Sequence, residues 1–222
     1  MDQKLGSIKK KTPILFCSKK VKDGMVIISA ADFEVAPIKK LEVFHKQKFV
    51  SCGIGSLAAA KDAYKLIPQI RGEDVVIVGT CGSFGDFVGV ELVTGEDVYW
   101  LPSGQRLGYA WSIEKEIPHI KLSCTSYFEQ LPKRTILSSP TISKYKGMTG
   151  TLKEIFCDEE NIVENLELYP LVSQINPYAK SISIILGVTN EICLLARDQW
   201  KRHYKEAAIK TADYLQRCLP II

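Results

Sequence analysis

Short, continuous apolar runs that alternate with helical patterns are the feature that most constrains the fold of this sequence. In residues 181–188 the run from Ile182 to Gly187 is almost unbroken by polar side chains. Strands of this kind are buried on both faces, and their alternation with helices is typical of α/β domains. We therefore expect a single α/β domain with a mixed central β-sheet flanked by helices. The expected strands are 25–29, 48–55, 74–85, 90–100, 134–139 and 181–188, and the expected helices are 56–70, 161–175 and 199–219.

The length of 222 residues predicts one large domain, which we place at residues 25–222. Residues 1–24 form a basic N-terminal extension that holds seven lysines. Because the net charge is only +4, the rest of the chain is close to neutral and lacks the concentrated basic face of a nucleic-acid-binding protein. No apolar run approaches the roughly 18 residues of a membrane span, and the first residues lack the apolar core of a signal peptide. We therefore expect a cytoplasmic protein that does not bind membranes.

The seven cysteines are scattered along the chain and include no C-x-x-C pair. The three histidines lie in separate regions, and no cluster has the spacing of a zinc site. We therefore expect free thiols in a reducing compartment, no metal and no cofactor. Five cysteines sit beside apolar segments, which predicts that they are buried: Cys17, Cys52, Cys81, Cys157 and Cys193.

The polar residues that follow the apolar runs are the candidates for a site, because ligands collect at the carboxyl ends of strands in sheets of this class. Glu34 follows the first run, and Thr189 and Asn190 follow the last. A carboxylate such as Glu34 can act as a general acid or base in a cleft, although its local sequence favours a solvated position. The Gly-rich segment 79–86 matches neither G-x-x-x-x-G-K-[ST] nor G-x-G-x-x-G, so we interpret it as a tight turn.

A second carboxylate, Glu167, lies between Leu166 and Leu168 in a segment that is otherwise apolar on one face. It can lie on the exposed side of a helix, or it can face a pocket and accept hydrogen bonds from sugar hydroxyls. The local sequence leaves both interpretations open.

Five pieces of the sequence, taken in order, resemble the nucleoside phosphorylase/nucleosidase superfamily, whose members cleave the N-glycosidic bond of nucleosides. They are "VIISAADFEV", "CGIGSLAAA", "VGTCGSFGD", "NLELYPL" and "GVTN", and they span nearly the whole chain. Within the superfamily, "GVTN…RDQW" looks like the futalosine hydrolases, which carry Ser-Asn after the last strand, whereas methylthioadenosine nucleosidases carry Ser-Asp there. Futalosine hydrolases act in a route to menaquinone and release hypoxanthine from a nucleoside with a carboxylated aromatic chain on its 5′ carbon.

The resemblance implies roles for the residues that match the motifs. Glu34 matches the carboxylate that activates the attacking water, and Glu167 matches the carboxylate that holds the ribose hydroxyls. Leu166 stands at the Met position that packs under the sugar, and Ser83 matches the serine near the sugar and the water. These matches imply a hydrolase that binds a small nucleoside.

The pair Thr189-Asn190 occupies the base-recognition position of the superfamily, and chemistry supports a 6-oxopurine there. Hypoxanthine presents two acceptors, O6 and N7, and an amide NH2 can donate to either, whereas a carboxylate has no proton to spare. Arg197 is a candidate for the 5′ carboxylate; the alternative interpretation makes it a partner for Asp198 or for a nearby helix end. The residue that stacks on the base is not evident from the motifs, and we expect it at or near Ile142.

Three alternatives to a futalosine hydrolase remain. Asn190 disfavours a methylthioadenosine/S-adenosylhomocysteine nucleosidase, and the lack of Arg or Lys before Lys39 in the segment after the first strand disfavours a phosphorylase. A divergent protein that binds nucleosides without cleaving them is disfavoured by the presence of both Glu34 and Glu167. The resemblance also implies a homodimer in which a neighbouring chain closes the 5′ end of the site.

Overall fold

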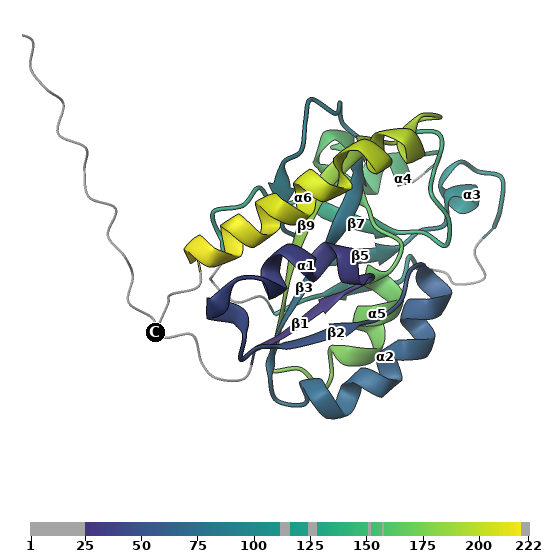
Figure 1. Cartoon of the computed structure of the whole chain (residues 1–222). Helices are drawn as coiled ribbons and strands as arrows, with labels where there is room; N and C mark the ends of the chain where they lie inside the picture. Colours follow the sequence, from purple (N-terminus) through teal and green to yellow (C-terminus); the bar gives the residue numbers. More distant parts are fainter. Residues whose placement is uncertain (1–24, 112–115, 124–127, 151, 157, 219–222) are drawn as a thin grey trace, which may run out of the picture.

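A computed structural model describes residues 25–111, 116–123, 128–150, 152–156 and 158–218 (Figure 1). The expected N-terminal extension, residues 1–24, lies outside these residues, as do Cys17 and Cys157. No helix within the described ranges combines the length and the apolar character needed to cross a membrane.

One mixed sheet forms the centre of the protein. The long strands β3 (Asp74–Ser83) and β9 (Ser181–Glu191) pair in parallel along their whole length. Strand β1 (Met25–Ser29) pairs in parallel with the other edge of β3, and β2 (Lys48–Ser51) follows β1. The remaining strands extend the sheet from the end of β3 or flank β9: β4 (Leu92–Val93), β5 (Asp97–Trp100), β6 (His119–Lys121), β7 (Thr135–Ser138) and β8 (Ile162–Glu164).

Helices cover both faces of this sheet (Figure 1). On one face α1 (Asp32–Lys39) packs against α6 (Ala196–Cys218), and on the other α2 (Ser56–Ile70) packs against α5 (Leu168–Ile175). Alternate residues of β1 enter the two cores: Val26 faces the α2–α5 side and Ile27 the α1–α6 side, and both are fully buried. Shorter helical turns are α3 (Ser103–Arg106), α4 (Leu152–Ile155), Glu42–Phe44 and Glu159–Asn161. The predicted fold class is therefore confirmed.

Close packing of α6 on β9 depends on Gly187. A Cβ atom at this position would lie 2.5 Å from the Cβ of Ala207, so only glycine allows the helix to approach the strand this closely. The contact fixes the position of α6 relative to the sheet.

Three of the expected elements are wrong in part. The expected strand 48–55 ends at Ser51, and Gly53 and Gly55 beyond it have positive φ angles of 81° and 86°, which do not occur in a regular strand. The expected strand 90–100 is two strands, β4 and β5, because the chain passes close to a neighbouring segment at Gly95, where a Cβ would lie 2.5 Å from the carbonyl oxygen of Arg134. The expected helix 161–175 contains β8 and begins only at Leu168. Pro170 lies in the first turn of α5, where its missing N–H has no helical acceptor, so the helix continues without a break.

The cysteines are free thiols in the described part of the chain. Cys52 and Cys81 are buried as expected, whereas Cys193 is only partly buried because it follows β9 in the turn before α6.

Candidate active site

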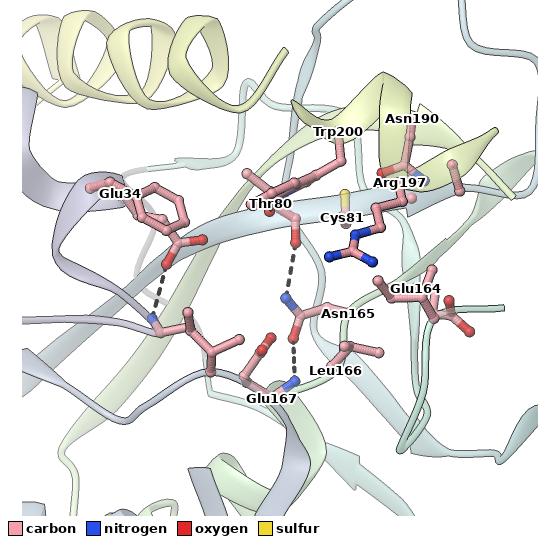
Figure 2. A pocket seen from close by; sticks show the side chains of 16 residues that line it. Glu34, Thr80, Cys81, Glu164, Asn165, Leu166, Glu167, Asn190, Arg197 and Trp200 are labelled. Carbon is pink, nitrogen blue, oxygen red and sulfur yellow. Dashed lines mark hydrogen bonds between the residues drawn. The ribbon is translucent and has the colours of Figure 1, made fainter. Parts of the chain in front are cut away.

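A pocket of about 200 Å³ opens where the strand ends meet the starts of α1 and α6 (Figure 2). Among its lining residues are three carboxylates, an amide, a guanidinium and an indole, which come from segments far apart in the sequence. They are Glu34, Glu164, Glu167, Asn190, Arg197 and Trp200. The position agrees with the rule that α/β sheets bind ligands at the carboxyl ends of their strands.

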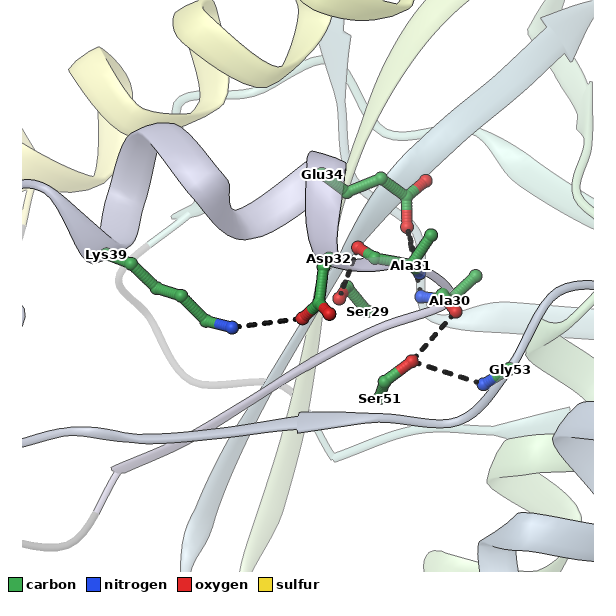
Figure 3. A network of polar contacts seen from close by, with 8 residues as sticks. All are labelled: Ser29, Ala30, Ala31, Asp32, Glu34, Lys39, Ser51 and Gly53. Atoms are coloured by element: carbon green, nitrogen blue, oxygen red, sulfur yellow. Dashed lines mark hydrogen bonds and ion pairs between the residues drawn. The ribbon is translucent and has the colours of Figure 1, made fainter.

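Glu34 enters the pocket from the first turn of α1. Its Oε2 accepts hydrogen bonds from the backbone N–H groups of Ala30 (3.0 Å) and Ala31 (3.1 Å) (Figure 3). Burial, together with the nearby Glu167 carboxylate, raises the pKa of Glu34 to about 7, although the backbone hydrogen bonds to the carboxylate oppose the rise. The solvated position that its local sequence favours is therefore wrong. A carboxylate with a pKa near 7 is suited to take up a proton at neutral pH.

The backbone that holds Glu34 is fixed by the ends of the two neighbouring strands. The Ser29 hydroxyl donates to the Ala31 carbonyl oxygen (3.0 Å), and the Ser51 hydroxyl donates to the Ala30 carbonyl oxygen (2.9 Å) (Figure 3). Both amides that bind the Glu34 carboxylate therefore belong to a segment with little freedom to move.

Glu167 lines the same pocket and does not lie on the exposed side of a helix. Its Oε1 accepts a hydrogen bond of 2.7 Å from the N–H of Gly55, at the start of α2. Burial raises the pKa of Glu167, while the Gly55 N–H opposes the rise. Since each acid is desolvated and the two repel one another, the pair holds less negative charge at neutral pH than two solvated carboxylates would.

Asn165 explains where α5 begins. Its Oδ1 accepts from the N–H groups of Glu167 and Leu168, both at 2.9 Å, and its Nδ2 donates to the Thr80 carbonyl oxygen at 3.0 Å. The side chain thus binds the first backbone N–H groups at the start of the helix and ties this start to β3. The apolar spacing of residues 161–167 gives no sign of these contacts, which is why the sequence predicts helix there.

A β-bulge places Asn190 in the pocket. Cys81 pairs with Val188 but Gly82 pairs with Asn190, so Thr189 is an extra residue in β9. A Cβ at Gly82 would lie 2.7 Å from Asn190 Nδ2, so this glycine makes room for the amide. Residues 79–83 therefore continue strand β3, and the expected tight turn is wrong there.

The Asn190 amide is held by its neighbours in the strand. The Thr189 hydroxyl lies 3.1 Å from Asn190 Oδ1 and 3.3 Å from the Cys81 carbonyl oxygen, and Asn190 Nδ2 donates to the Glu191 carbonyl oxygen at 3.1 Å. An NH2 group has two hydrogens, so one remains for a ligand.

The first two turns of α6 supply the rest of the wall. Trp200 donates from Nε1 to the Thr80 hydroxyl (3.1 Å), stacks on Tyr204 with ring centroids 5.0 Å apart, and meets Phe33 edge-on.

Figure 2 shows the Arg197 guanidinium directed toward the interior of the pocket. Asp198 lies 3.9 Å from Lys201, and within the described ranges no carboxylate lies within 4 Å of Arg197, so the expected alternative of an Arg197–Asp198 pair is wrong. A cation in a first helical turn is also opposed by the helix dipole.

Most of the candidate residues from the sequence meet in this one pocket. Its lining includes Glu34, Ile142, Leu166, Glu167, Asn190 and Arg197. Ser83 and Thr189 are buried next to it but are not among the lining residues, and Thr189 supports Asn190 from behind.

Among the residues of the wall that the sequence did not single out as site residues are Phe33, Glu164 and Trp200. Phe33 and Trp200 adjoin motif residues, so their position beside Glu34 and Arg197 was an available signal. Glu164 lies in the segment interpreted as helix and had no local signal.

No protein-family model matches the sequence, and a comparison with curated proteins gives no match. Solved structures do match in shape. A Helicobacter pylori methylthioadenosine nucleosidase mutant with 5′-methylthioadenosine in its active site is 14% identical, with a TM-score of 0.65 over 88% of this chain and 97% of that chain.

Two other solved structures show the same similarity. The native futalosine hydrolase of Helicobacter pylori strain 26695 is 12% identical, with a TM-score of 0.64 over 87% of this chain and 96% of that one. A Streptococcus pneumoniae MTA/SAH nucleosidase in complex with 8-aminoadenine is 17% identical, with a TM-score of 0.66 over 90% and 100%. At these identities the similarity shows a shared fold and does not choose among the activities.

The buried Glu34 carboxylate should lower stability at neutral and alkaline pH. Its pKa rises from 4.5 to about 7 on folding, so between these values the unfolded chain has lost a proton that the folded protein still binds, and stability falls as the pH rises. A shift of this size corresponds to about 3 kcal/mol. The free energy of unfolding of Glu34→Gln, relative to wild type, should therefore increase by about 2–3 kcal/mol between pH 5 and pH 8.

Urea unfolding at several pH values measures this difference. The exposed carboxylate of Glu42 provides the control, since Glu42→Gln should show no such trend. A difference between Glu34→Gln and wild type that does not change with pH would contradict the raised pKa.

Proposed function

We propose that this protein is a hydrolase that cleaves the N-glycosidic bond of a 6-oxopurine nucleoside, with futalosine as substrate and hypoxanthine as the released base. The proposal includes a role in menaquinone biosynthesis, the process in which futalosine hydrolases act. The observation that carries it is the presence of Glu34, Glu167 and Asn190 in one pocket of a nucleosidase-like fold.

Glu34 is the general base of the proposed reaction. It accepts a proton from water as the water oxygen forms a bond to C1′ of the ribose and the bond from C1′ to the purine nitrogen breaks. The raised pKa of Glu34, about 7, makes the carboxylate basic enough for this transfer at neutral pH. The sugar carries positive charge in the transition state, and the departing base carries the electron pair of the broken bond.

Glu167 binds the ribose hydroxyls. Gly55 occupies one oxygen of its carboxylate, and a carboxylate has further lone pairs for two adjacent hydroxyl groups. This contact positions C1′ against the water, and Leu166 packs under the sugar. Ser83 and Thr189 complete the proposed substrate-binding set from behind the lining residues: Thr189 holds the Asn190 amide, and Ser83 ends β3 on the side of the sugar and the water.

Asn190 stabilises the leaving base and selects it. Its free N–H donates to O6 or N7 of hypoxanthine as negative charge develops on the purine. The amide does not transfer its proton, so the base receives a proton from water after it leaves. An adenine nucleoside offers a donor where hypoxanthine offers O6, which would leave two donors facing each other in a buried site.

Arg197 and Trp200 form the part of the site that binds the 5′ substituent. Of the described residues that line the pocket, Arg197 is the one cation, and Trp200 lies one helical turn away from it. A guanidinium binds a carboxylate through two hydrogen bonds, and an indole offers a flat surface to an aromatic chain. These groups suit the carboxylated aromatic chain of futalosine better than the small methylthio group of methylthioadenosine.

The proposed activity is tested by incubating the protein with futalosine, inosine and methylthioadenosine, with and without phosphate, and identifying the free base. We expect hypoxanthine from futalosine at a higher kcat/KM than from inosine, with no effect of phosphate. Glu34→Gln should lower kcat by about 10²–10⁴-fold, since general bases typically contribute that much.

The control for this assay is Glu42→Gln, which changes an exposed carboxylate. Release of adenine from methylthioadenosine as the preferred reaction would show that the substrate is wrong. Dependence on phosphate would show a phosphorylase, and binding without cleavage would show a nucleoside-binding protein.

Replacing Asn190 with Asp should change which base is accepted. The variant loses a hydrogen bond to O6 or N7 in a buried site, which costs on the order of 1–3 kcal/mol. The ratio of kcat/KM for futalosine to kcat/KM for its 6-amino analogue should therefore fall by about 10–100-fold. Asn176→Asp, at the far end of α5, is the matched control. If the ratio in a stable Asn190→Asp protein equals that of wild type, Asn190 does not read the base.

We also propose that the protein is a homodimer. Leu57 and Tyr64, two helical turns apart on α2, are 85% and 75% exposed, and Ile54 beside them is 67% exposed while it lines the pocket. A second copy on this face would cover apolar surface and close the site.

Sedimentation equilibrium should give twice the 24.8 kDa of one chain. Leu57→Glu should favour the monomer and Ile209→Glu, on α6, should not; a monomeric wild type would refute the dimer.

A further inference from the structure

Residues 139–149, here called the 139–149 loop, form one wall of the pocket without being part of a helix or strand. Ile142 lines the pocket from this loop and is 51% exposed. A loop of this length has many conformations unless other groups fix it, and its position decides where Ile142 lies. The contacts that hold the loop therefore bear on ligand binding.

Glu164 holds the loop from the side of the sheet. It is the last residue of β8 and is 6% exposed. Its Oε2 accepts a hydrogen bond of 2.9 Å from the Ser143 N–H, and its Oε1 accepts another from the Ser143 hydroxyl. Ser143 follows Ile142 directly, so the carboxylate fixes the backbone beside the residue that faces the pocket. Figure 2 shows the Glu164 carboxylate directed away from the centre of the pocket.

Arg106 holds the same loop from the other side. This side chain is 1% exposed, and its Nη2 donates to the Tyr145 carbonyl oxygen at 2.7 Å while its Nη1 donates to the Gly147 carbonyl oxygen. Its guanidinium lies 4.8 Å from the centre of the Phe84 ring. Lys146 adds an ion pair of 2.6 Å with Glu191, the residue after Asn190. Charged groups thus hold the loop at four residues: Ser143, Tyr145, Lys146 and Gly147.

We propose that Glu164 is a positioning residue, which fixes the 139–149 loop through Ser143 and so holds Ile142 against the bound base. Contact with the base rests on the proposed function, whereas the attachment of the loop does not. Glu164 touches neither the ribose nor the attacking water, so it acts on binding and not on bond cleavage.

A carboxylate suits this position because Ser143 presents a backbone N–H and a hydroxyl that can both donate to it. An ionised carboxylate offers two acceptor oxygens, so both bonds form at once and both are strengthened by its charge. A Gln side chain has the same shape but is neutral, and the Ser143 hydroxyl has to turn and accept from its NH2 group. Glu164→Gln therefore weakens both contacts without creating a large cavity.

The first experiment separates binding from catalysis. Glu164→Gln should raise KM for the nucleoside and Kd for free hypoxanthine by about tenfold, since hydrogen bonds to buried charged groups are of that strength. The kcat should stay within about threefold, because Glu34 and Glu167 are unaffected. Glu160→Gln, an exposed carboxylate in the same segment, is the matched control. A fall in kcat at unchanged KM and Kd would overturn the positioning role.

The second experiment needs no activity. Lys144 and Lys146 lie in the loop, so trypsin cleavage after these residues, mapped by mass spectrometry, reports its release. Glu164→Gln should be cut there about tenfold faster than wild type and Glu160→Gln, because its neutral side chain binds both groups of Ser143 more weakly than the carboxylate does. Ser143→Ala, which removes only the hydroxyl, should show a smaller increase in the same direction and serves where Glu164→Gln does not fold.

The trypsin experiment decides the inference independently of the proposed function. A protein that cleaves no nucleoside refutes the proposed function, and the trypsin rates still decide whether Glu164 fixes the loop. Cleavage of the loop at the wild-type rate in both Glu164→Gln and Ser143→Ala overturns the inference even if the protein is an active hydrolase.

Discussion

The pairing of β3 with β9 is the constraint on which the rest of the structure depends. The two strands run in parallel from Asp74 to Ser83 and from Ser181 to Glu191, with one bulge at Thr189. The helices of both faces pack against them, and the pocket opens at their shared end. In a regular strand the side chain of Asn190 would point to the other face of the sheet, because successive side chains of a strand alternate. One extra residue therefore decides that Asn190 faces the ligand.

The pocket concentrates buried acids, and the structure stabilises each with hydrogen-bond donors. Glu34 binds two backbone amides, Glu167 binds the Gly55 amide, and Glu164 binds both donors of Ser143. Burial still raises the pKa of all three. The site thus holds groups that would be more stable in water, which is the usual relation between an active site and the free energy of folding. The donors to Glu34 and Glu167 are backbone amides at the ends of strands and at the start of a helix, so these two acids keep their positions in spite of this cost.

Much of the fold follows from the sequence, because strands buried on both faces leave continuous apolar runs. The strand 25–29 and the helix 56–70 match β1 and α2 at both ends. The segment 161–175 does not, since Ile162 and Val163 fit a helical pattern as well as a strand, and only the contacts of Asn165 with Thr80 and the α5 amides decide between them. Short strand pairs such as β5–β6 depend on long-range partners and leave too few residues for a periodic signal.

The site is predictable to the extent that it lies in motifs. Glu34, Glu167 and Asn190 were identified from the pieces that resemble nucleosidases, and they meet in one pocket. Glu164 was not, because its importance comes from Ser143, which is distant in sequence and close only after folding.

The close packing of α6 on β9 at Gly187 and Ala207 divides the pocket residues into two groups that can change separately in evolution. Arg197 and Trp200 lie on the first two turns of α6, ahead of that contact, whereas the acids and Asn190 belong to the sheet and to α1 and α5. Under the proposed function, a few substitutions on those turns would alter which 5′ substituents are accepted without disturbing bond cleavage. Descendants of such a chain could diversify in substrate range while inheriting the same chemistry.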